Sequence, residues 1–341
     1  MSGDPVIRNL ILSLTGTCNY ACAYCYAAYH PENRMPVDTA LKATDMAGKS
    51  GKPFILQFTG GEPLLAFSTI QAVTEHVETK RYPAVIQLQT NASLMTEEIA
   101  EYLKRHKIAT GVSLDGRPPV NDSLRKMKNG NSASEATIRG IRLLAARQIP
   151  IGLTCVVTDG NVKKLPGIVQ MAYYLGNVRQ VGFDLLRCQG RGTALRPAKP
   201  RDVVIAVEQC YALAQQLEKA TGIHIRFSQL EKIRKIVSGK ACPFGQCYAM
   251  RGEEAYVTSD GKIYACSSLA GDPAFLLGNV WDGMDSEMTK QAGDYIAGAM
   301  HACRACPHLS ACGGGCFTRW QGRDGRAEEE CAMQQAFAKY I

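Results

Sequence analysis

The stretch that decides the fold of this chain is Leu10–Cys25, LILSLTGTCNYACAYC, in which an apolar, strand-like run leads directly into three cysteines. Cys18, Cys22 and Cys25 have the spacing C-x3-C-x2-C, and three thiolates can hold three corners of an iron–sulfur cube while the fourth iron stays open. A cube that only transfers electrons is normally held by four cysteines, and structural zinc is normally four-coordinate. The loop therefore predicts an iron that binds a substrate or a cofactor.

A second loop, Gly60-Gly61-Glu62-Pro63, follows the next strand-like run, Phe54–Thr59. Two glycines let the backbone approach a ligand closely, and the carboxylate of Glu62 offers an anionic acceptor at the carboxyl end of a strand. By itself this loop would be a turn, and the cysteine loop would be a zinc knuckle or three core cysteines. Because the two loops are about one βα unit apart, together they favour a cofactor site.

The cysteine loop also contains Tyr24, which completes the pattern C-x3-C-x-Φ-C and resembles the radical S-adenosylmethionine (radical SAM) enzymes. The resemblance implies that Cys18, Cys22 and Cys25 are catalytic and hold a [4Fe–4S] cluster whose open iron chelates SAM. One electron then cleaves SAM to methionine and a 5′-deoxyadenosyl radical. The resemblance also implies that the Gly60–Pro63 loop holds the methionine amino group of SAM.

Strand-like and helical patterns alternate along the first two thirds of the chain. Six βα units in series predict a parallel sheet with helices on its outer face. The resemblance makes this an α/β fold, a partial (β/α)6 TIM-type barrel with its active site at the carboxyl ends of the strands. The expected strands are Ile7–Leu14, Phe54–Thr59, Val85–Thr90, Ala109–Leu114, Ile151–Val157 and Val181–Leu186. The expected helices are Val37–Lys49, Ser68–Lys80, Thr96–Lys107, Ser134–Arg147, Val162–Leu175 and Arg201–Thr221.

Short polar side chains stand at the ends of the third and fourth expected strands, among them Asn91, Ser113 and Asp115. In radical SAM enzymes that modify peptides, a similar S-x-D-G is commonly followed by an N/H-D-x-x-R segment, which residues 121–125 match here. The resemblance implies that Ser113 contacts the ribose of SAM and that Arg125 lies near the SAM carboxylate or the substrate. It places Asn91 and Asp115 in the same cofactor site. The alternative for Asp115 is an ordinary turn.

The second half of the chain carries a larger set of cysteines. From Cys247 onward, their spacing reproduces the seven-cysteine SPASM pattern, named for its subtilosin, PQQ, sulfatase and mycofactocin maturation members, and Cys242 makes an eighth. Eight thiolates can close two four-coordinate cubes, which makes three [4Fe–4S] clusters in all. Two zinc ribbons are the competing interpretation, since C-x2-C is equally a zinc signature. The resemblance assigns one auxiliary cluster to Cys242, Cys247, Cys266 and Cys316, and the other to Cys303, Cys306, Cys312 and Cys331.

Length and composition limit the class of protein. At 341 residues, two domains are the default, and we expect the barrel in residues 1–222 and a bridging region with a small irregular iron–sulfur (SPASM) domain in residues 223–341. No run of apolar residues is long enough to span a membrane and Met1–Asp4 has no leader pattern, which predicts a cytoplasmic protein. Fourteen cysteines then indicate metal binding rather than disulfides. The formal charge of +8 falls to about +3 once three clusters are counted, so no nucleic-acid partner is expected.

Three cysteines remain outside these sets. Cys155 lies in an expected strand and Cys210 in an expected helix, so both are predicted to be core residues. Cys188 follows the sixth strand in a glycine-rich, basic loop at the expected active face. It is either an ordinary loop thiol or a substrate-facing, catalytic one.

These observations predict a SPASM-type radical SAM enzyme that modifies a peptide or protein, forming a thioether or carbon–carbon crosslink. Its expected partners are the peptide and an external one-electron donor of the flavodoxin or ferredoxin type. An auxiliary cluster would take up an electron, and a barrel closed by the cluster domain would keep the radical from water. The first strand begins within ten residues of the N-terminus, so the peptide is expected to be held by the barrel and cluster domain or by a separate leader-binding protein.

Three other functions stay open. An anaerobic sulfatase maturase, which forms formylglycine, typically has an Asp after the cysteine corresponding to Cys266, where this chain has Ser267. A non-catalytic iron–sulfur electron carrier or scaffold would leave the open iron and the Gly60–Pro63 loop unexplained. A zinc-dependent nucleic-acid binder would be colourless and would bind polynucleotides tightly.

Overall fold

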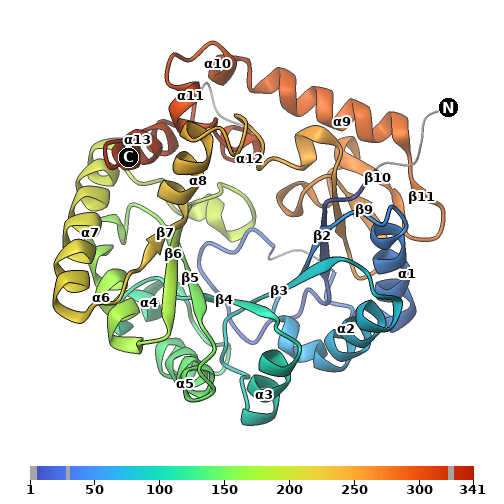
Figure 1. The fold of residues 1–341 in the computed structure, drawn as a ribbon, viewed down its shortest axis with the longest axis horizontal. Coiled ribbons are helices and arrows are strands. Elements are labelled where there is room, and N and C mark those ends of the chain that lie inside the picture. The colour runs from blue at the N-terminus through green and yellow to red at the C-terminus, as the bar shows by residue number, and fades with distance from the viewer. Residues whose placement is uncertain (1–5, 28–30, 322–325) are drawn as a thin grey trace.

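A computed structural model describes residues 6–27, 31–321 and 326–341. Met1–Asp4, on which the expectation of no leader peptide is based, lie outside these ranges. Within those ranges the chain forms one curved sheet with helices around its outer side (Figure 1). The strand order is β11-β10-β9-β8-β1-β2-β3-β4-β5-β6-β7. No helix of the described residues is both long and apolar enough to cross a membrane.

The six predicted strands are confirmed, each within three residues at its ends. Each pairs in parallel with the next, for example Leu10 with Leu56 between the first two and Val112 with Leu153 between the fourth and fifth. The strands are β1 (Asn9–Ser13), β2 (Phe54–Thr59), β3 (Ala84–Thr90), β4 (Ala109–Ser113), β5 (Ile151–Val157), β6 (Val178–Leu185), β7 (Arg226–Phe227), β8 (Glu254–Val257), β9 (Lys262–Tyr264), β10 (Leu276–Asn279) and β11 (Gly283–Met284).

The predicted helices are confirmed as well, although the one expected from Val162 begins at Pro166, after a 3₁₀ turn. Side chains cap the starts of the helices that begin at Glu97 and Ala133. The Thr96 hydroxyl accepts a hydrogen bond from the Ile99 amide at 3.2 Å, and two glutamates follow in the first turn, where the helix dipole favours negative charge. The helices are α1 (Val37–Gly48), α2 (Phe67–Lys80), α3 (Glu97–Arg105), α4 (Pro118–Leu124), α5 (Ala133–Ala146), α6 (Pro166–Leu175), α7 (Pro200–Thr221), α8 (Ser228–Val237), α9 (Ser286–Ala299), α10 (His301–Arg304), α11 (Leu309–Cys312), α12 (Phe317–Trp320) and α13 (Glu328–Ala338).

Alternation along the strands separates an apolar face from a polar one. In β2, Phe54, Leu56 and Phe58 are buried in the main hydrophobic core, while Gln57 and Thr59 line cavities on the other face. The helices cover the apolar face (Figure 1). Because side chains alternate with a period of two, the concave face of the barrel is left to the polar residues.

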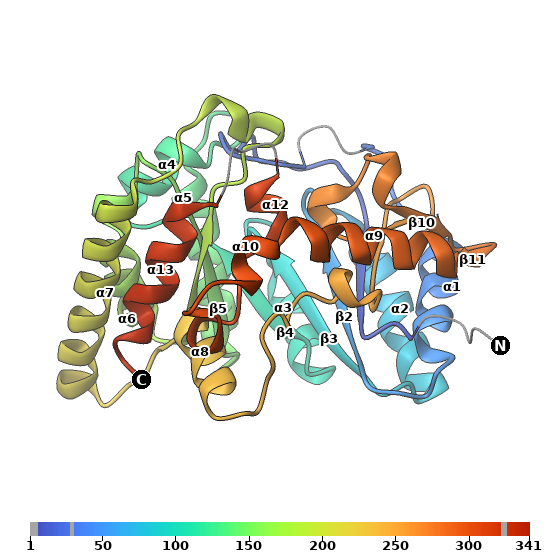
Figure 2. The same ribbon diagram turned by 90° about the horizontal axis from the view of Figure 1, so that it is seen from above.

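The C-terminal region extends the same sheet and returns to its far end. β8 pairs in parallel with β1, and β9 to β11 continue from it in antiparallel order. From α9, packed against β10, the helices run to α13, which packs against α7 and α8 (Figure 2). There Phe337 stacks on Phe183 and Tyr340 on Tyr211. The sheet thus continues across the expected domain boundary after residue 222, and that boundary stays a prediction.

Candidate active site

A cavity of about 420 Å³ lies at the carboxyl ends of the barrel strands. Its walls come from the loops that follow β1, β2, β3, β4 and β6, which are far apart in the sequence. The structure therefore brings most of the predicted site residues to one place. Those lining the cavity are Cys18, Cys22, Cys25, Gly60, Gly61, Asn91, Ser113 and Arg125.

The cysteine loop is anchored on both sides by backbone hydrogen bonds. Ala21 N–H donates to the Lys126 carbonyl at 2.7 Å and Ala23 N–H to the Leu124 carbonyl at 2.8 Å, while the Arg191 side chain donates to the Cys22 carbonyl. Burial raises the pKa of the Cys18 thiol to about 12. Such a thiol loses its proton when a cation binds it, and three thiols at one cavity suit an iron–sulfur cluster.

Gly60 and Gly61 line the cavity as expected, and they also have a packing role that the sequence did not predict. Gly60 has φ +133°, and a Cβ there would lie 2.3 Å from the Thr15 carbonyl oxygen; a Cβ on Gly61 would lie 2.2 Å from that of Thr17. Gly61 N–H donates to Thr15 at 2.6 Å. The glycines therefore let this loop pack directly on the segment that leads into Cys18, which joins the two sequence motifs.

Glu62 does not line the cavity, contrary to the expectation that its carboxylate faces the cofactor. It is fully buried and accepts hydrogen bonds from the amides of Leu64 (3.1 Å) and Asn91 (2.8 Å) and from the Thr90 hydroxyl (2.5 Å). Burial raises the pKa of Glu62 to about 6, although these donors oppose the shift. Its role in the structure is to tie the loop after β2 to the end of β3.

Asp115 also lies behind the cavity wall and is not among its lining residues. Its carboxylate accepts hydrogen bonds from Arg125 Nε at 2.9 Å, from the Val156 amide at 2.8 Å and from the Tyr24 hydroxyl. Burial disfavours the charge of Arg125, but Asp115 beside it keeps the pKa of the guanidinium above its ordinary value. Asp115 thus holds Arg125 at the cavity wall. The turn alternative for Asp115 does not account for this buried ion pair.

The other residues of the predicted cofactor motifs differ in whether they support the cavity wall or line it. Asn121 accepts a hydrogen bond from the Asp115 amide at 3.0 Å, so the N-D-x-x-R segment braces the S-x-D-G loop. Asn91 Nδ2 lies 3.9 Å from Cys18 Sγ, and Ser113 Oγ accepts from Gln89 Nε2 at 3.0 Å. Asn91, Ser113 and Arg125 are therefore the expected cofactor residues that present polar groups to the cavity.

A second cavity of about 340 Å³ lies in the C-terminal region. Cys303, Cys306, Cys312 and Cys331 all line it, although Cys331 follows the others by nearly twenty residues in the sequence. These are the four thiols that the resemblance assigns to one auxiliary cluster. Four thiols around one cavity fit a closed cube.

Of the remaining thiols of the C-terminal region, three lie near one another: Cys247, Cys266 and Cys316. Burial raises the pKa of Cys247 to about 11 and raises that of Cys266 further, and the nearby Cys316 adds to both shifts. Cys316 thus lies with Cys247 and Cys266, a crossing that the spacing alone does not reveal. Cys242 is exposed, on a loop whose Phe244 amide donates to the Gly313 carbonyl at 2.7 Å. In the described part of the chain, no three His, Cys, Asp or Glu side chains are grouped tightly enough to hold a single metal ion.

A charged network that the sequence did not reveal joins the cavity to this region. Asp184, at the carboxyl end of β6, lines the cavity and pairs with Arg187 and Arg319, each at 2.6 Å. Burial would raise the pKa of Asp184, but the two guanidinium groups outweigh it and hold the pKa near 2. Arg319 also pairs with Glu330, which accepts a hydrogen bond from the Cys316 amide at 3.0 Å. In the sequence, the only indication of this network is Asp184 itself, a charged residue near the end of an expected strand.

The three cysteines outside the cluster sets and Ser267 lie in different surroundings. Cys188 is exposed and does not line the cavity, while Cys155 and Cys210 are buried as predicted. Ser267, at the position where sulfatase maturases typically have an Asp, is hydrogen-bonded to Tyr26, and Tyr26 lines the cavity next to Cys25. The C-terminal region therefore reaches the cavity wall at Tyr26 as well as at Asp184.

Comparison with known proteins agrees with this geometry. The family model described as the radical SAM superfamily matches residues 12–171. An uncharacterized protein of Methanocaldococcus jannaschii is 33% identical over 278 residues, which cover 81% of this chain and 90% of that protein. The cysteine-type anaerobic sulfatase-maturating enzyme of Clostridium perfringens is 23% identical over 338 residues, covering 92% and 89%. The solved structure of anSMEcpe with bound AdoMet and Cp18Cys peptide shares the fold, with a TM-score of 0.81 at 21% identity, covering 98% and 97%.

Proposed function

This chain belongs to the radical SAM superfamily, in the SPASM-type maturase group, and we propose that it crosslinks a ribosomally made peptide through a thioether or carbon–carbon bond. The family implies SAM and a [4Fe–4S] cluster, which together supply a 5′-deoxyadenosyl radical when bound. The observation that carries the proposal is the meeting of Cys18, Cys22 and Cys25 with polar groups from three other loops at one cavity.

The chain's own residues suit the binding of SAM at this cavity. The fixed positive charge of Arg125, held by Asp115, suits the SAM carboxylate. The hydroxyl of Ser113 suits the ribose, and backbone carbonyls of the Gly60–Gly61 loop suit the methionine ammonium. Asn91, beside Cys18, can orient the bound methionine group. The roles of Arg125, Ser113 and the Gly60–Gly61 loop are carried over from the resemblance, and that of Asn91 rests on its place beside Cys18 at the cavity.

The C-terminal cysteines suit two auxiliary clusters, one held by Cys303, Cys306, Cys312 and Cys331, the other by Cys242, Cys247, Cys266 and Cys316. Both sets lie in the region that contacts the cavity wall through Arg319 and Ser267. Forming a crosslink removes two hydrogens from the peptide. One leaves as the hydrogen atom abstracted by the radical, so one electron and one proton must leave as well. A cluster held by either set of thiols would accept that electron while the proton passes to water, and an external flavodoxin- or ferredoxin-type donor would supply the electron that cleaves SAM.

A second candidate, formation of formylglycine in a sulfatase-type peptide, is favoured by the relative that matches over nearly the whole chain. That reaction needs a base for the substrate thiol or hydroxyl. Among the described residues, the carboxylates that line the active-site cavity are those of Glu32 and Asp184. Asp184 is a poor base because two guanidinium groups hold its pKa near 2. The Tyr26–Ser267 pair offers hydroxyl groups where the maturases typically have a carboxylate.

Mass spectrometry of the product separates the two candidates. The anaerobically reconstituted protein would be incubated with SAM, dithionite and either a sulfatase-derived cysteine peptide or a short precursor peptide encoded beside its gene. Crosslinking predicts loss of two hydrogens with sulfur retained and a covalent link between two residues. Conversion of the cysteine to an aldehyde with loss of sulfur would instead establish the maturase reaction. Cleavage of SAM with no change in either peptide would refute both.

A further inference from the structure

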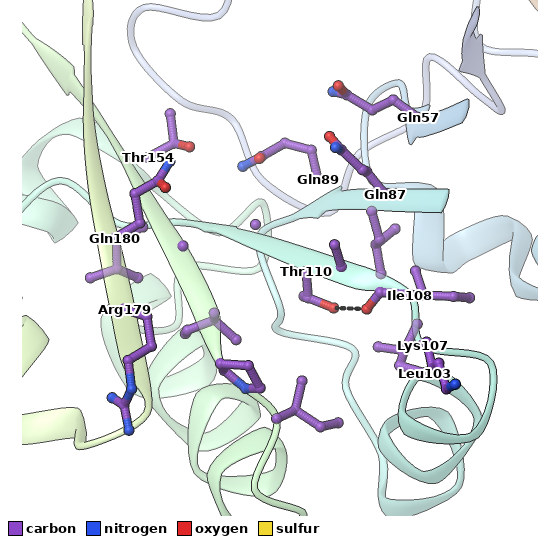
Figure 3. Close-up of a pocket in the computed structure, with 18 of the residues that line it drawn as sticks. Gln57, Gln87, Gln89, Leu103, Lys107, Ile108, Thr110, Thr154, Arg179 and Gln180 are labelled. Atoms are coloured by element: carbon purple, nitrogen blue, oxygen red, sulfur yellow. Dashed lines mark hydrogen bonds between the residues drawn. The ribbon is translucent and has the colours of Figure 1, made fainter. Parts of the chain in front are cut away.

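A further cavity, of about 640 Å³, opens at the amino-terminal ends of the barrel strands, and Cys18, Cys22 and Cys25 do not line it. Figure 3 shows residues that do. The rim of the cavity comes from the segments that precede β4 and β5 and from the start of β6, including Lys107, Gln148 and Arg179. Its inner wall consists of residues on the concave face of the sheet. The active-site cavity does not account for this space.

The inner wall is polar where a barrel interior is usually filled by branched aliphatic side chains. Gln57, Gln87, Gln89 and Gln180 project into the cavity from β2, β3 and β6, with Thr154 from β5 beside them (Figure 3). Gln89 and Gln180 are hydrogen-bonded to Ser113 and Ser228. Within the described residues, no hydrogen bond is found for the side-chain amides of Gln57 and Gln87. Both side chains are half-buried at this cavity, so water or a ligand inside it can hydrogen-bond to their amides.

Glycines keep the space open between these side chains. A Cβ on Gly111 would lie 2.3 Å from Gln89 Oε1, so a larger residue in β4 would displace that amide. A Cβ on Gly152 in β5 would come no closer than 4.0 Å to Gln180. Both glycines stand where a TIM-type barrel would normally place bulky residues. The polar hollow is therefore a feature of the strands themselves.

The charge at the rim is of one sign. Lys104, Lys107, Arg179 and Arg226 line the cavity, and no carboxylate is among its described lining residues. Among the described residues, Arg179 has no carboxylate partner and donates to the backbone carbonyls of Gly176 and Val178. The other three make no ion pair within the described part of the chain. Uncompensated cations around a concave, polar space favour an anionic ligand.

Two rim residues keep side chains where the backbone favours glycine. Lys107 and Gln148 follow α3 and α5 in left-handed conformation, with φ of 53° and 59°. Arg81 follows α2 in the same conformation, with φ of 54°, but does not line the cavity. Glycine is the usual residue at this helix-terminating position because it has no Cβ. Arg81 thus provides an internal comparison for Lys107.

We propose that this cavity is a binding site for a small molecule with a carboxylate or phosphate group, held by the cationic rim and hydrogen-bonded by the glutamine amides. This site is additional to the proposed crosslinking activity and does not depend on it. Gln57, Gln89 and Thr154 line both this cavity and the active-site cavity, so the inner end of the ligand lies against the floor of the active site.

Isothermal titration calorimetry of the reconstituted protein at low ionic strength tests the proposal, with citrate and inorganic phosphate as separate probes. One of them should bind at one site per chain, and the arm that binds identifies the anion class. Lys107→Gly should weaken binding by about tenfold or more, as expected for a lost charge-assisted contact. Arg81→Gly removes the same charge from the same backbone conformation and should change binding by no more than about twofold.

Two further measurements distinguish binding inside the cavity from nonspecific binding of the anion to exposed basic residues. Gln87→Leu, which leaves the rim charges unchanged, should also weaken binding because it removes an amide from the inner wall. Saturation with SAM should leave binding in place, since neither the rim cations nor Gln87 lines the active-site cavity. The proposal is overturned if neither anion binds, if Lys107→Gly and Arg81→Gly have equal effects, or if SAM displaces the probe. An unchanged unfolding midpoint in Lys107→Gly would show that its loss of binding is not a loss of fold.

Discussion

Arg319 in the C-terminal region pairs with Asp184 at the end of β6, with Nη2 2.6 Å from Oδ1. The two residues are 135 positions apart, and their contact joins the active-site wall to the region that holds the second set of cysteines. Arg319 also pairs with Glu330, whose carboxylate accepts from the Cys316 amide. A disturbance at either end of this network should therefore reach the other.

Arg319→Ala tests the importance of that connection. Removing the guanidinium leaves Glu330 buried without its cation, which should destabilise the protein by about 3 kcal/mol. SAM cleavage without peptide should persist, whereas conversion of the peptide should fall. Thermal unfolding and product analysis would measure the two effects, with Arg319→Lys as the control that keeps the charge. Full peptide conversion by Arg319→Ala would show that the network does not position the substrate site.

Glu62→Gln should impair SAM binding although Glu62 lies outside the cavity. The NH2 group of the new glutamine would face the backbone N–H of Leu64 or Asn91, both of which donate to Glu62. One hydrogen bond would be lost, at a cost of about 1–3 kcal/mol. The ends of the β2 and β3 loops would then shift. Equilibrium binding of SAM would be compared with that of Glu75→Gln, which changes an exposed glutamate on α2. Equal affinity in both variants would contradict the bracing role of Glu62.

The assignment of Cys316 can be tested through iron content. Three cubes predict about twelve irons per chain, and loss of one auxiliary cube predicts about eight. Cys316→Ala and Cys266→Ala should lose the same electron paramagnetic resonance signal, and Cys312→Ala and Cys331→Ala the other one. Pairing of Cys316 with Cys312 in this experiment would reverse the assignment. Zinc at these cysteines would refute the auxiliary clusters altogether.

Replacement of Cys18, Cys22 and Cys25 by Ala should abolish formation of 5′-deoxyadenosine, because these thiols line the cavity with the predicted SAM-binding groups. The absorbance of the auxiliary clusters should persist, since their cysteines lie elsewhere. Chromatography of the reaction mixture with dithionite measures the first effect and visible absorption the second. Continued SAM cleavage by the triple variant would mean that the catalytic loop has been misplaced.

Cys188→Ser should keep nearly full peptide conversion, because Cys188 is exposed and does not line the cavity. The measurement is turnover of the peptide substrate, with SAM cleavage as the control for folding. Loss of conversion with SAM cleavage intact would restore the catalytic role that the sequence left open for this thiol.

Several features could be predicted from local sequence because their causes are local. Alternating apolar residues place β2 in a sheet with one face buried, and Thr96 starts α3 through a hydrogen bond within its own first turn. The spacing of Cys18, Cys22 and Cys25 needs only one loop to bring the thiols together. For the same reason, the sequence predicted which loops meet at the cavity.

The direction of individual side chains depended on contacts made far along the chain. Glu62 and Asp115 both stand at strand ends, yet each carboxylate turns away from the cavity, because buried donors from other loops satisfy it. Cys316 joins Cys247 and Cys266 only after the C-terminal region has folded back on the sheet. The sequence alone determined the strands, helices and thiol inventory through short-range periodicity and spacing. The tertiary structure decided which polar groups face a cavity, because the curvature of the sheet sets residues such as Gln57 and Gln180 across a common space.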